Sequence, residues 1–107
     1  MHMNMKVMKF GGTSLRSEAT RKYVYRHVLE SSKTNKVIVV VSAMGRYGAP
    51  YATDTLAGLI APQGGDNWLR DRDLLICCGE MISSAVFADC LRTAGHDACA
   101  LTGGQAG

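Results

Sequence analysis

The residues with the clearest capacity for chemistry lie near the N-terminus, where Lys9 precedes the pair Gly11-Gly12 and the pair Thr13-Ser14. Adjacent glycines carry no Cβ atoms, so their backbone N–H groups can point together toward an anion. A helix that begins just beyond them would add free N–H groups and the positive end of its dipole. With the Lys9 ammonium beside the turn, this stretch predicts a site for a polyphosphate.

Two familiar phosphate-binding motifs do not match this spacing. A Walker A loop carries its lysine after the glycines, in G-x-x-x-x-G-K-[ST], and a dinucleotide fingerprint requires G-x-G-x-x-G. A tight strand-to-helix turn with a solvated Lys9 accounts for the pattern equally well. The spacing alone therefore leaves both interpretations open.

The flanking segments predict an α/β fold. Residues 7–10 form an apolar run typical of a strand, and a helical pattern capped by Ser17 continues to about Ser32. Residues 37–41 are five consecutive β-branched residues, which predicts a strand covered on both faces of a parallel sheet. The helix between the strands would be a right-handed crossover, so both strands would end at the same edge.

Polar residues follow the second strand at that edge, where ligands bind in open α/β sheets. Ser42 is therefore a candidate ligand group, although an ordinary turn serine is the alternative. Residues 46–52 are rich in breakers and aromatic rings, which predicts a mobile loop. The run Thr53-Asp54-Thr55 would then cap a short helix through Leu56, Leu59 and Ile60.

The C-terminal half predicts one buried helical segment and a third strand. Residues 74–91 are apolar almost all round, so we expect them in the centre of the layer, capped by Asp71 or Asp73 and broken by Gly79. Glu80 is a carboxylate in this apolar run and would need a cationic partner, for which an arginine is one candidate. Residues 97–101 read as a short strand.

Composition narrows the class of protein. The 107 residues are 47% hydrophobic and 20% charged, which fits one soluble globular domain or less. We expect no membrane span and no nucleic acid partner, because no apolar run looks long enough and the net charge is only +3. Residues 1–4 lack a signal-peptide pattern, which favours a cytoplasmic setting.

Cysteine and histidine spacing does not favour a metal site. The four cysteines contain no C-x-x-C pair, and Cys77 and Cys78 lie in an apolar stretch with no histidine near them. This predicts buried, reduced thiols at Cys77, Cys78, Cys90 and Cys99. His27 and His96 are isolated, so a surface or helix-face position is expected for each.

Four segments resemble the aspartokinases, a branch of the amino acid kinase family. They are K-F-G-G-T-S at 9–14, S-A-M-G at 42–45, G-E-M-I-S at 79–83 and the T-G-G turn at 102–104. The resemblance covers residues 6–107 and corresponds to the opening part of the family's kinase domain. It implies that residues 1–107 are the N-terminal part of a three-layer α/β/α amino acid kinase fold with a mainly parallel sheet, without the nucleotide-binding part and the ACT domains.

The resemblance also implies an activity, the transfer of the γ-phosphoryl group of ATP to the side-chain carboxylate of L-aspartate. This reaction begins lysine, threonine and methionine biosynthesis. ATP would act as a substrate with Mg²⁺, for which this stretch offers no protein ligand. Lys9 would stabilise the transferring phosphoryl group, and Gly11 and Gly12 would donate N–H groups to phosphate. The residues implied for aspartate are Ser42, Thr53 and Glu80, the last facing the α-ammonium.

Two alternatives to this function remain. One is a non-catalytic half-domain that associates with itself through an uncovered sheet edge. The other is a kinase of the same family that acts on a different acid. For residues 1–107 alone we expect no activity and the formation of a homo-oligomer.

Overall fold

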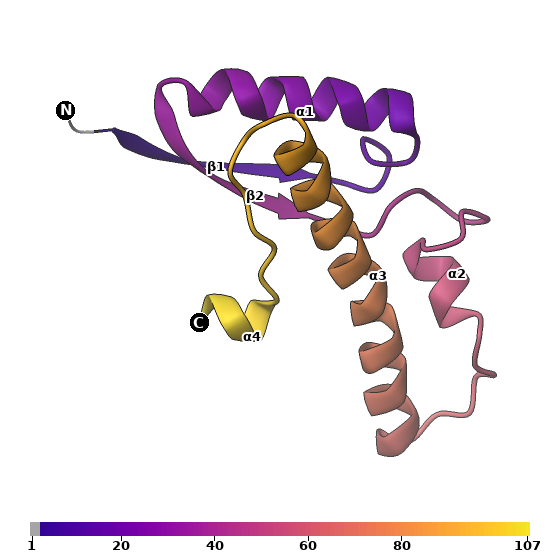
Figure 1. Ribbon diagram of the computed structural model, residues 1–107. Helices are drawn as coiled ribbons and strands as arrows, with labels where there is room; N and C mark the ends of the chain where they lie inside the picture. Colours follow the sequence, from indigo (N-terminus) through magenta and orange to yellow (C-terminus); the bar gives the residue numbers. More distant parts are fainter. Residues whose placement is uncertain (1–2) are drawn as a thin grey trace.

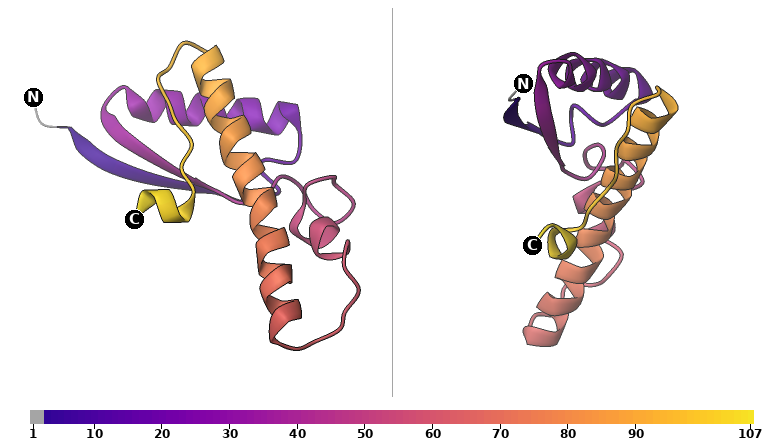
Figure 2. Two further views of the ribbon diagram at one scale, coloured as in Figure 1. Left: turned by 60° about the horizontal axis from the view of Figure 1, so that its bottom comes forward. Right: turned by 60° about the vertical axis from the view of Figure 1, so that its left-hand side comes forward.

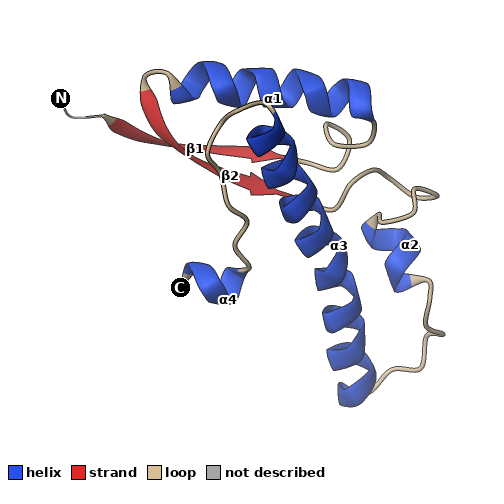
Figure 3. Cartoon of the chain, viewed as in Figure 1, coloured by secondary structure: helices blue, strands red, loops and turns tan. Residues whose placement is uncertain are grey.

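The computed structural model describes residues 3–107. The first two residues of segment 1–4, which lacks a signal-peptide pattern, lie outside the described residues. Two strands and four helices follow one another along the chain (Figures 1 and 3). They are β1 (Asn4–Phe10), α1 (Glu18–Ser32), β2 (Asn35–Val41), α2 (Thr53–Ala57), α3 (Asp66–Thr93) and α4 (Gly103–Ala106).

The two strands form a parallel pair in which Asn4 lies opposite Asn35 and Phe10 lies opposite Val41. Helix α1 connects them as a crossover on one side of the sheet (Figure 3). Because the strands are parallel and in register, both end at the same edge. The predicted α/β arrangement is confirmed.

Helix α1 begins where the sequence predicts. The Ser17 hydroxyl accepts from the Thr20 N–H at 3.2 Å, and the Ser17 N–H donates to the Thr20 hydroxyl at 3.1 Å. Two backbone donors at the helix start are thereby satisfied. This capped start leads Val24 and Val28 into the core, where both are buried.

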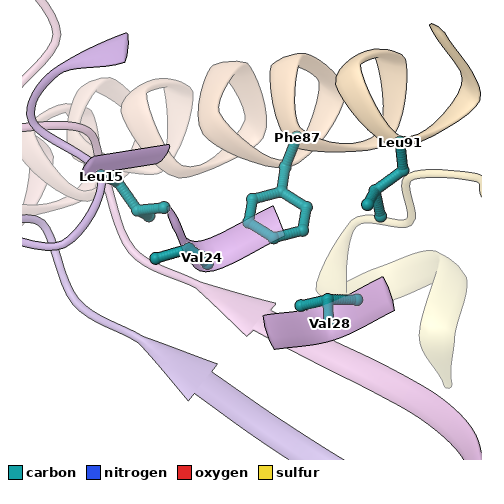
Figure 4. Packing of buried hydrophobic residues seen from close by; sticks show 5 residues of the cluster. All are labelled: Leu15, Val24, Val28, Phe87 and Leu91. Atoms are coloured by element: carbon teal, nitrogen blue, oxygen red, sulfur yellow. The ribbon is translucent and has the colours of Figure 1, made fainter. Parts of the chain in front are cut away.

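The core lies between α1, the C-terminal half of α3 and one face of the sheet. Its buried cluster comprises Leu15, Val24, Val28, Phe87 and Leu91 (Figure 4). Alternate strand residues pack against this cluster, namely Met8, Phe10, Val37, Val39 and Val41. Leu15 is fully buried, so the segment that follows the double glycine is anchored directly in the core.

The opposite face of the sheet is open, contrary to the prediction that β2 is covered on both faces. Val7, Ile38 and Val40 are 62%, 47% and 44% exposed. No element within residues 3–107 lies against that face, so burial alternates along β2 even though the sequence does not. The continuous β-branched run at residues 37–41 therefore indicates a preference for strand structure, but it does not indicate burial of both faces.

Helix α3 differs from the prediction in three respects. It begins after Gly65 and not at Asp71 or Asp73, it continues unbroken through Gly79, and most of it is exposed, with Leu74 70% accessible. Its first half extends away from the sheet in both views of Figure 2. Helix α2 packs against α3, but Leu69 and Leu74 of this half remain exposed.

Gly79 permits a close contact and does not break the helix. A Cβ atom at this position would lie 2.8 Å from the Tyr51 carbonyl oxygen and 3.2 Å from the Ala43 Cβ atom. Only a glycine lets α3 approach the loop after β2 this closely. The buried position of Gly79 thus fixes where α3 crosses the end of the sheet.

Length and composition alone would allow α3 to cross a membrane, which corrects the expectation that no run is long enough. Among the described residues it is the one helix of this kind, and 28% of its most apolar window is buried. The core helix of a soluble protein satisfies the same test. The packing of Phe87 and Leu91 in the core favours that interpretation of α3.

Residues 97–101 do not form the predicted third strand. The described sheet contains β1 and β2 only, so this segment has no strand to pair with. It is held instead by the Arg92 guanidinium, which donates to the Ala98 carbonyl at 3.0 Å. Helix α4 follows, capped by Thr102.

The cysteines are free, but three of the four are exposed, contrary to the prediction of buried thiols. Cys77 and Cys78 lie on the uncovered half of α3, which is the reason for their exposure. Cys90 alone is half-buried. His27 lies on an exposed face of α1, with its ring 4.7 Å from that of Tyr23.

Tyr25 carries a buried hydroxyl in the core. Its ring meets the edge of Phe87 at a centroid distance of 4.7 Å, and its hydroxyl oxygen has no hydrogen-bond partner among the described residues. Burial, together with the neighbouring Cys90 thiol, raises the pKa of Tyr25 well above its ordinary value. The ionised phenolate is therefore disfavoured in the folded state.

We expect Tyr25 to ionise in a separate phase above pH ~10 when tyrosinate absorbance is followed during an alkaline titration. The unfolded chain loses this proton first, so the free energy of unfolding should fall as pH rises through that range. Tyr25→Phe should abolish both the late phase and this part of the pH dependence. A wild-type titration with no late phase would contradict the buried position of the hydroxyl.

Candidate functional site

A cavity of about 450 Å³ lies at the edge where both strands end. Its wall comes from the turn after β1, the loop after β2 and the first turn of α2. Four of the predicted site residues line it, namely Gly11, Gly12, Ser42 and Thr53. The structure therefore brings together residues from three separate motifs of the sequence.

Gly12 is the point at which the two loops meet. Its carbonyl oxygen accepts from the Leu15 N–H at 3.2 Å and from the Gly45 N–H at 3.0 Å. A Cβ atom on Gly12 would lie 2.5 Å from the Gly45 carbonyl oxygen and 2.8 Å from that of Ala43. These are backbone atoms that cannot move aside as a flexible side chain could, so the contact requires glycine.

Gly11 has a different environment. A Cβ atom at this position would meet no atom within 4 Å, so no packing constraint requires a glycine there. Gly11 nevertheless lines the cavity. Open space beside its backbone is what an anion-binding turn needs, since a side chain would occupy the volume of the ligand.

Ser42 and Thr53 take their places from the backbone. The Ser42 N–H donates to the Phe10 carbonyl at 3.2 Å, which extends the pairing of the strands into the cavity wall. Helix α2 starts at Thr53, after the N-cap residue Ala52, with no side-chain cap. The prediction that 53–55 caps this helix is therefore wrong, and the Thr53 hydroxyl makes no capping bond.

Lys9 and Glu80 do not line the cavity. Lys9 is exposed one residue before the end of β1, and its neighbours Met8 and Phe10 face the core. Alternation along the strand places Lys9 on the open face of the sheet. It is close to the turn in sequence, but its ammonium is not part of the cavity wall.

Glu80 is exposed on α3, so the expected cost of burying an unpaired carboxylate does not arise. Within the described part of the chain it forms no ion pair. The uncovered surface of α3 explains this outcome. The roles of Lys9 and Glu80 stay predictions.

The cavity is also lined by polar residues to which the sequence analysis gave no ligand role, namely Thr13, Ser14, Arg46, Tyr47 and Asp54. The Arg46 Nε–H donates to the Thr13 hydroxyl at 2.6 Å. The glycine and aromatic residues of segment 46–52 led to the prediction of a mobile loop, and no ligand role was assigned to Arg46. The available signal was a basic residue directly after the glycine of a strand-end turn.

The described residues contain no group of three or more His, Cys, Asp or Glu side chains placed to hold a metal ion. Asp54 is the carboxylate in the cavity wall. Magnesium that accompanies a nucleotide is bound mainly by the phosphates, water and one or two carboxylates. These residues therefore form no protein cage for the ion.

Comparison with known proteins points to one family. A family model described as the amino acid kinase family matches residues 4–107. The chain is 51% identical over 106 residues to aspartokinase 1 of Bacillus subtilis (strain 168), which covers 98% of this chain and 26% of that protein. It is 41% identical over the same length to an aspartokinase of Geobacillus stearothermophilus, and this match covers 98% of this chain and 25% of that protein.

A solved structure shares the fold. The crystal structure of aspartate kinase from Synechocystis matches with a TM-score of 0.70 at 32% identity, and the match covers 85% of this chain and 15% of that one. The chain spans about a quarter of the length of the curated relatives named above.

We expect Gly12→Ala and Gly11→Ala to differ sharply in urea denaturation. The alanine at 12 would clash with two carbonyl oxygens, and overpacking of this kind costs about 1–3 kcal/mol of unfolding free energy. The alanine at 11 meets no atom, so its unfolding midpoint should match that of the wild type. Equal losses in the two variants would contradict the described contact.

Proposed function

The chain belongs to the amino acid kinase family, and we propose that the protein that carries it is an aspartate kinase. Its substrates would be ATP and L-aspartate, and its products ADP and 4-phospho-L-aspartate. Relatives named aspartokinase that are 51% and 41% identical to this chain support the proposal. Residues 1–107 would supply the phosphate and amino acid side of the active site.

One observation carries this proposal beyond the likeness. One cavity at the strand ends is lined by Gly11, Gly12, Ser42 and Thr53. The first and last of these residues lie 42 positions apart in the sequence (53 minus 11). Phosphoryl transfer requires little from a protein except positioning and neutralisation of charge. A cavity that joins a glycine turn to two hydroxyl groups offers N–H and O–H donors that can position both substrates.

Each proposed role follows from the chemistry of the group. The N–H groups of Gly11 and Gly12 would donate to phosphate oxygens, and the hydroxyls of Ser42 and Thr53 would donate to the aspartate side-chain carboxylate. These contacts would hold the attacking carboxylate in line with the γ-phosphoryl group. The carboxylate is already a competent nucleophile, so no general base is needed.

Lys9 and Glu80 would complete the arrangement from outside the cavity wall. A lysine ammonium on its flexible four-carbon stem can follow charge that develops on the transferring phosphoryl group. The Glu80 carboxylate would pair with the α-ammonium of aspartate. Mg²⁺ would arrive with ATP and reduce the charge of its phosphates.

The relatives named above are bacterial, and we propose a cytoplasmic setting for this protein as well. We also propose that it forms a homo-oligomer. The exposed valines of the open sheet face support that proposal, because apolar strand faces are usually covered.

The activity can be tested on the protein that carries this chain by coupled detection of ADP release. We expect release that depends on L-aspartate, and trapping with hydroxylamine should yield the aspartyl hydroxamate expected of an acyl phosphate. L-Glutamate, N-acetylglutamate and UMP serve as alternative acceptors. ADP release with one of these and not with aspartate would assign a different member of the family.

Lys9→Ala should lower kcat by about 10²–10³-fold, the usual cost of losing one electrostatic contact to the transition state. Lys36→Ala is the matched control, since Lys36 is exposed on the same strand face at the far end of the sheet, opposite Met5. Its rate should equal that of the wild type. A Lys9→Ala rate within a few-fold of the control would remove Lys9 from the mechanism.

Glu80→Gln should raise the KM for aspartate far more than the KM for ATP, because its proposed partner is the ammonium of the amino acid. Glu80 is exposed, so the fold should be unaffected and the thermal midpoint unchanged. A larger effect on ATP would assign Glu80 to the nucleotide.

A further inference from the structure

Arg46 is the basic residue of the cavity wall. Within the residues that line the cavity it is the only lysine or arginine, and Asp54 is the only carboxylate. No ion pair joins these two residues in the described part of the chain. The Arg46 charge is therefore not neutralised by the one acid beside it.

The Arg46 side chain is held by the opposite loop. Its Nε–H donates to the Thr13 hydroxyl at 2.6 Å, a contact that joins the loop after β2 to the turn after β1. The backbone bond from the Gly45 N–H to the Gly12 carbonyl, 3.0 Å long, joins the same two segments one residue away. Two adjacent contacts thus orient the guanidinium at the cavity.

The rest of the guanidinium is available to a ligand. An arginine has five N–H donors, and the contact with Thr13 uses only the one on Nε. No protein acceptor for the two Nη groups occurs among the hydrogen bonds of residues 3–107. Paired Nη–H donors match the two oxygens of a carboxylate or a phosphate.

We propose that Arg46 is a substrate-binding residue that pairs with an oxyanion in this cavity, and that Thr13 is the positioning residue that orients it. The oxyanion is a carboxylate of the amino acid or a phosphate of the nucleotide. This assignment rests on the proposed function and adds to it the cation that the cavity wall itself provides, since Lys9 lies outside that wall.

The expected size of the effect follows from solvent exposure. A hydrogen bond to a charged group that is lost from a buried site can cost more than a hundredfold in affinity. Arg46 is exposed, so water and salt weaken its pairing. We therefore expect about a tenfold loss of affinity for one substrate.

The test uses the protein that carries this chain and four variants. Arg46→Ala removes the charge, Arg46→Lys keeps the charge without the planar fork, and Thr13→Val keeps Arg46 but removes its acceptor. Arg70→Ala is the control, since it removes the same charge from an exposed position on α3 outside the cavity. Calorimetry gives Kd for L-aspartate and for a non-hydrolysable ATP analogue, and steady-state assays give both KM values.

Arg46→Ala should raise Kd and KM about tenfold for one ligand and leave those for the other within twofold. An effect on aspartate assigns the carboxylate, and an effect on the analogue assigns the phosphate. Thr13→Val should weaken the same ligand by a smaller factor, Arg46→Lys should recover only part of the loss, and Arg70→Ala should match the wild type. A merely structural role would instead move the thermal midpoint and both ligands together.

Unchanged affinities in Arg46→Ala, or equal losses for both ligands, would overturn the assignment. Binding and turnover also separate this inference from the proposed function. If the wild type binds a ligand through Arg46 but releases no ADP with aspartate, the assignment of Arg46 stands and the proposed reaction fails. If turnover is normal in Arg46→Ala, the reaction stands and the assignment fails.

Discussion

The contact on which the site depends is the one between the backbones of Gly12 and Gly45. The Gly12 carbonyl accepts from the Gly45 N–H, and the same Gly12 has no space for a Cβ atom because two carbonyl oxygens occupy it. Parallel strands bring two loops to one edge, but they do not by themselves bring the loops into contact. This contact converts two strand ends into one cavity.

The core and α3 hold that contact in place from two sides. Leu15, which donates its N–H to the same Gly12 carbonyl, is fully buried beneath the turn. On the other side Gly79 lets α3 press against Ala43 and the Tyr51 carbonyl, so the loop after β2 is supported along its length. The cavity is therefore bordered by backbone segments whose positions are set by packing, which suits a site that works by positioning.

The sequence predicted the features that local chemistry determines. The strand, turn and helix around Gly11 and Gly12 and the Ser17 cap were correct because each follows from short-range preferences. The parallel pair was correct because a helix that connects two strands brings them side by side in one direction. The burial of β2 and α3, the third strand at 97–101 and the burial of the cysteines were wrong, because these depend on which elements pack against them. Arg46 was missed for a related reason, since its contact with Thr13 spans 33 residues.

Hydrogen exchange followed by mass spectrometry on the protein that carries this chain tests most directly whether both loops and α2 form one ligand site. With L-aspartate and a non-hydrolysable ATP analogue bound, peptides that cover residues 10–15, 42–46 and 51–55 should gain protection together over the same range of ligand concentration. Protection confined to one of these segments, or found on the open face of the sheet and not at its edge, would contradict a single cavity built on the Gly12 contact.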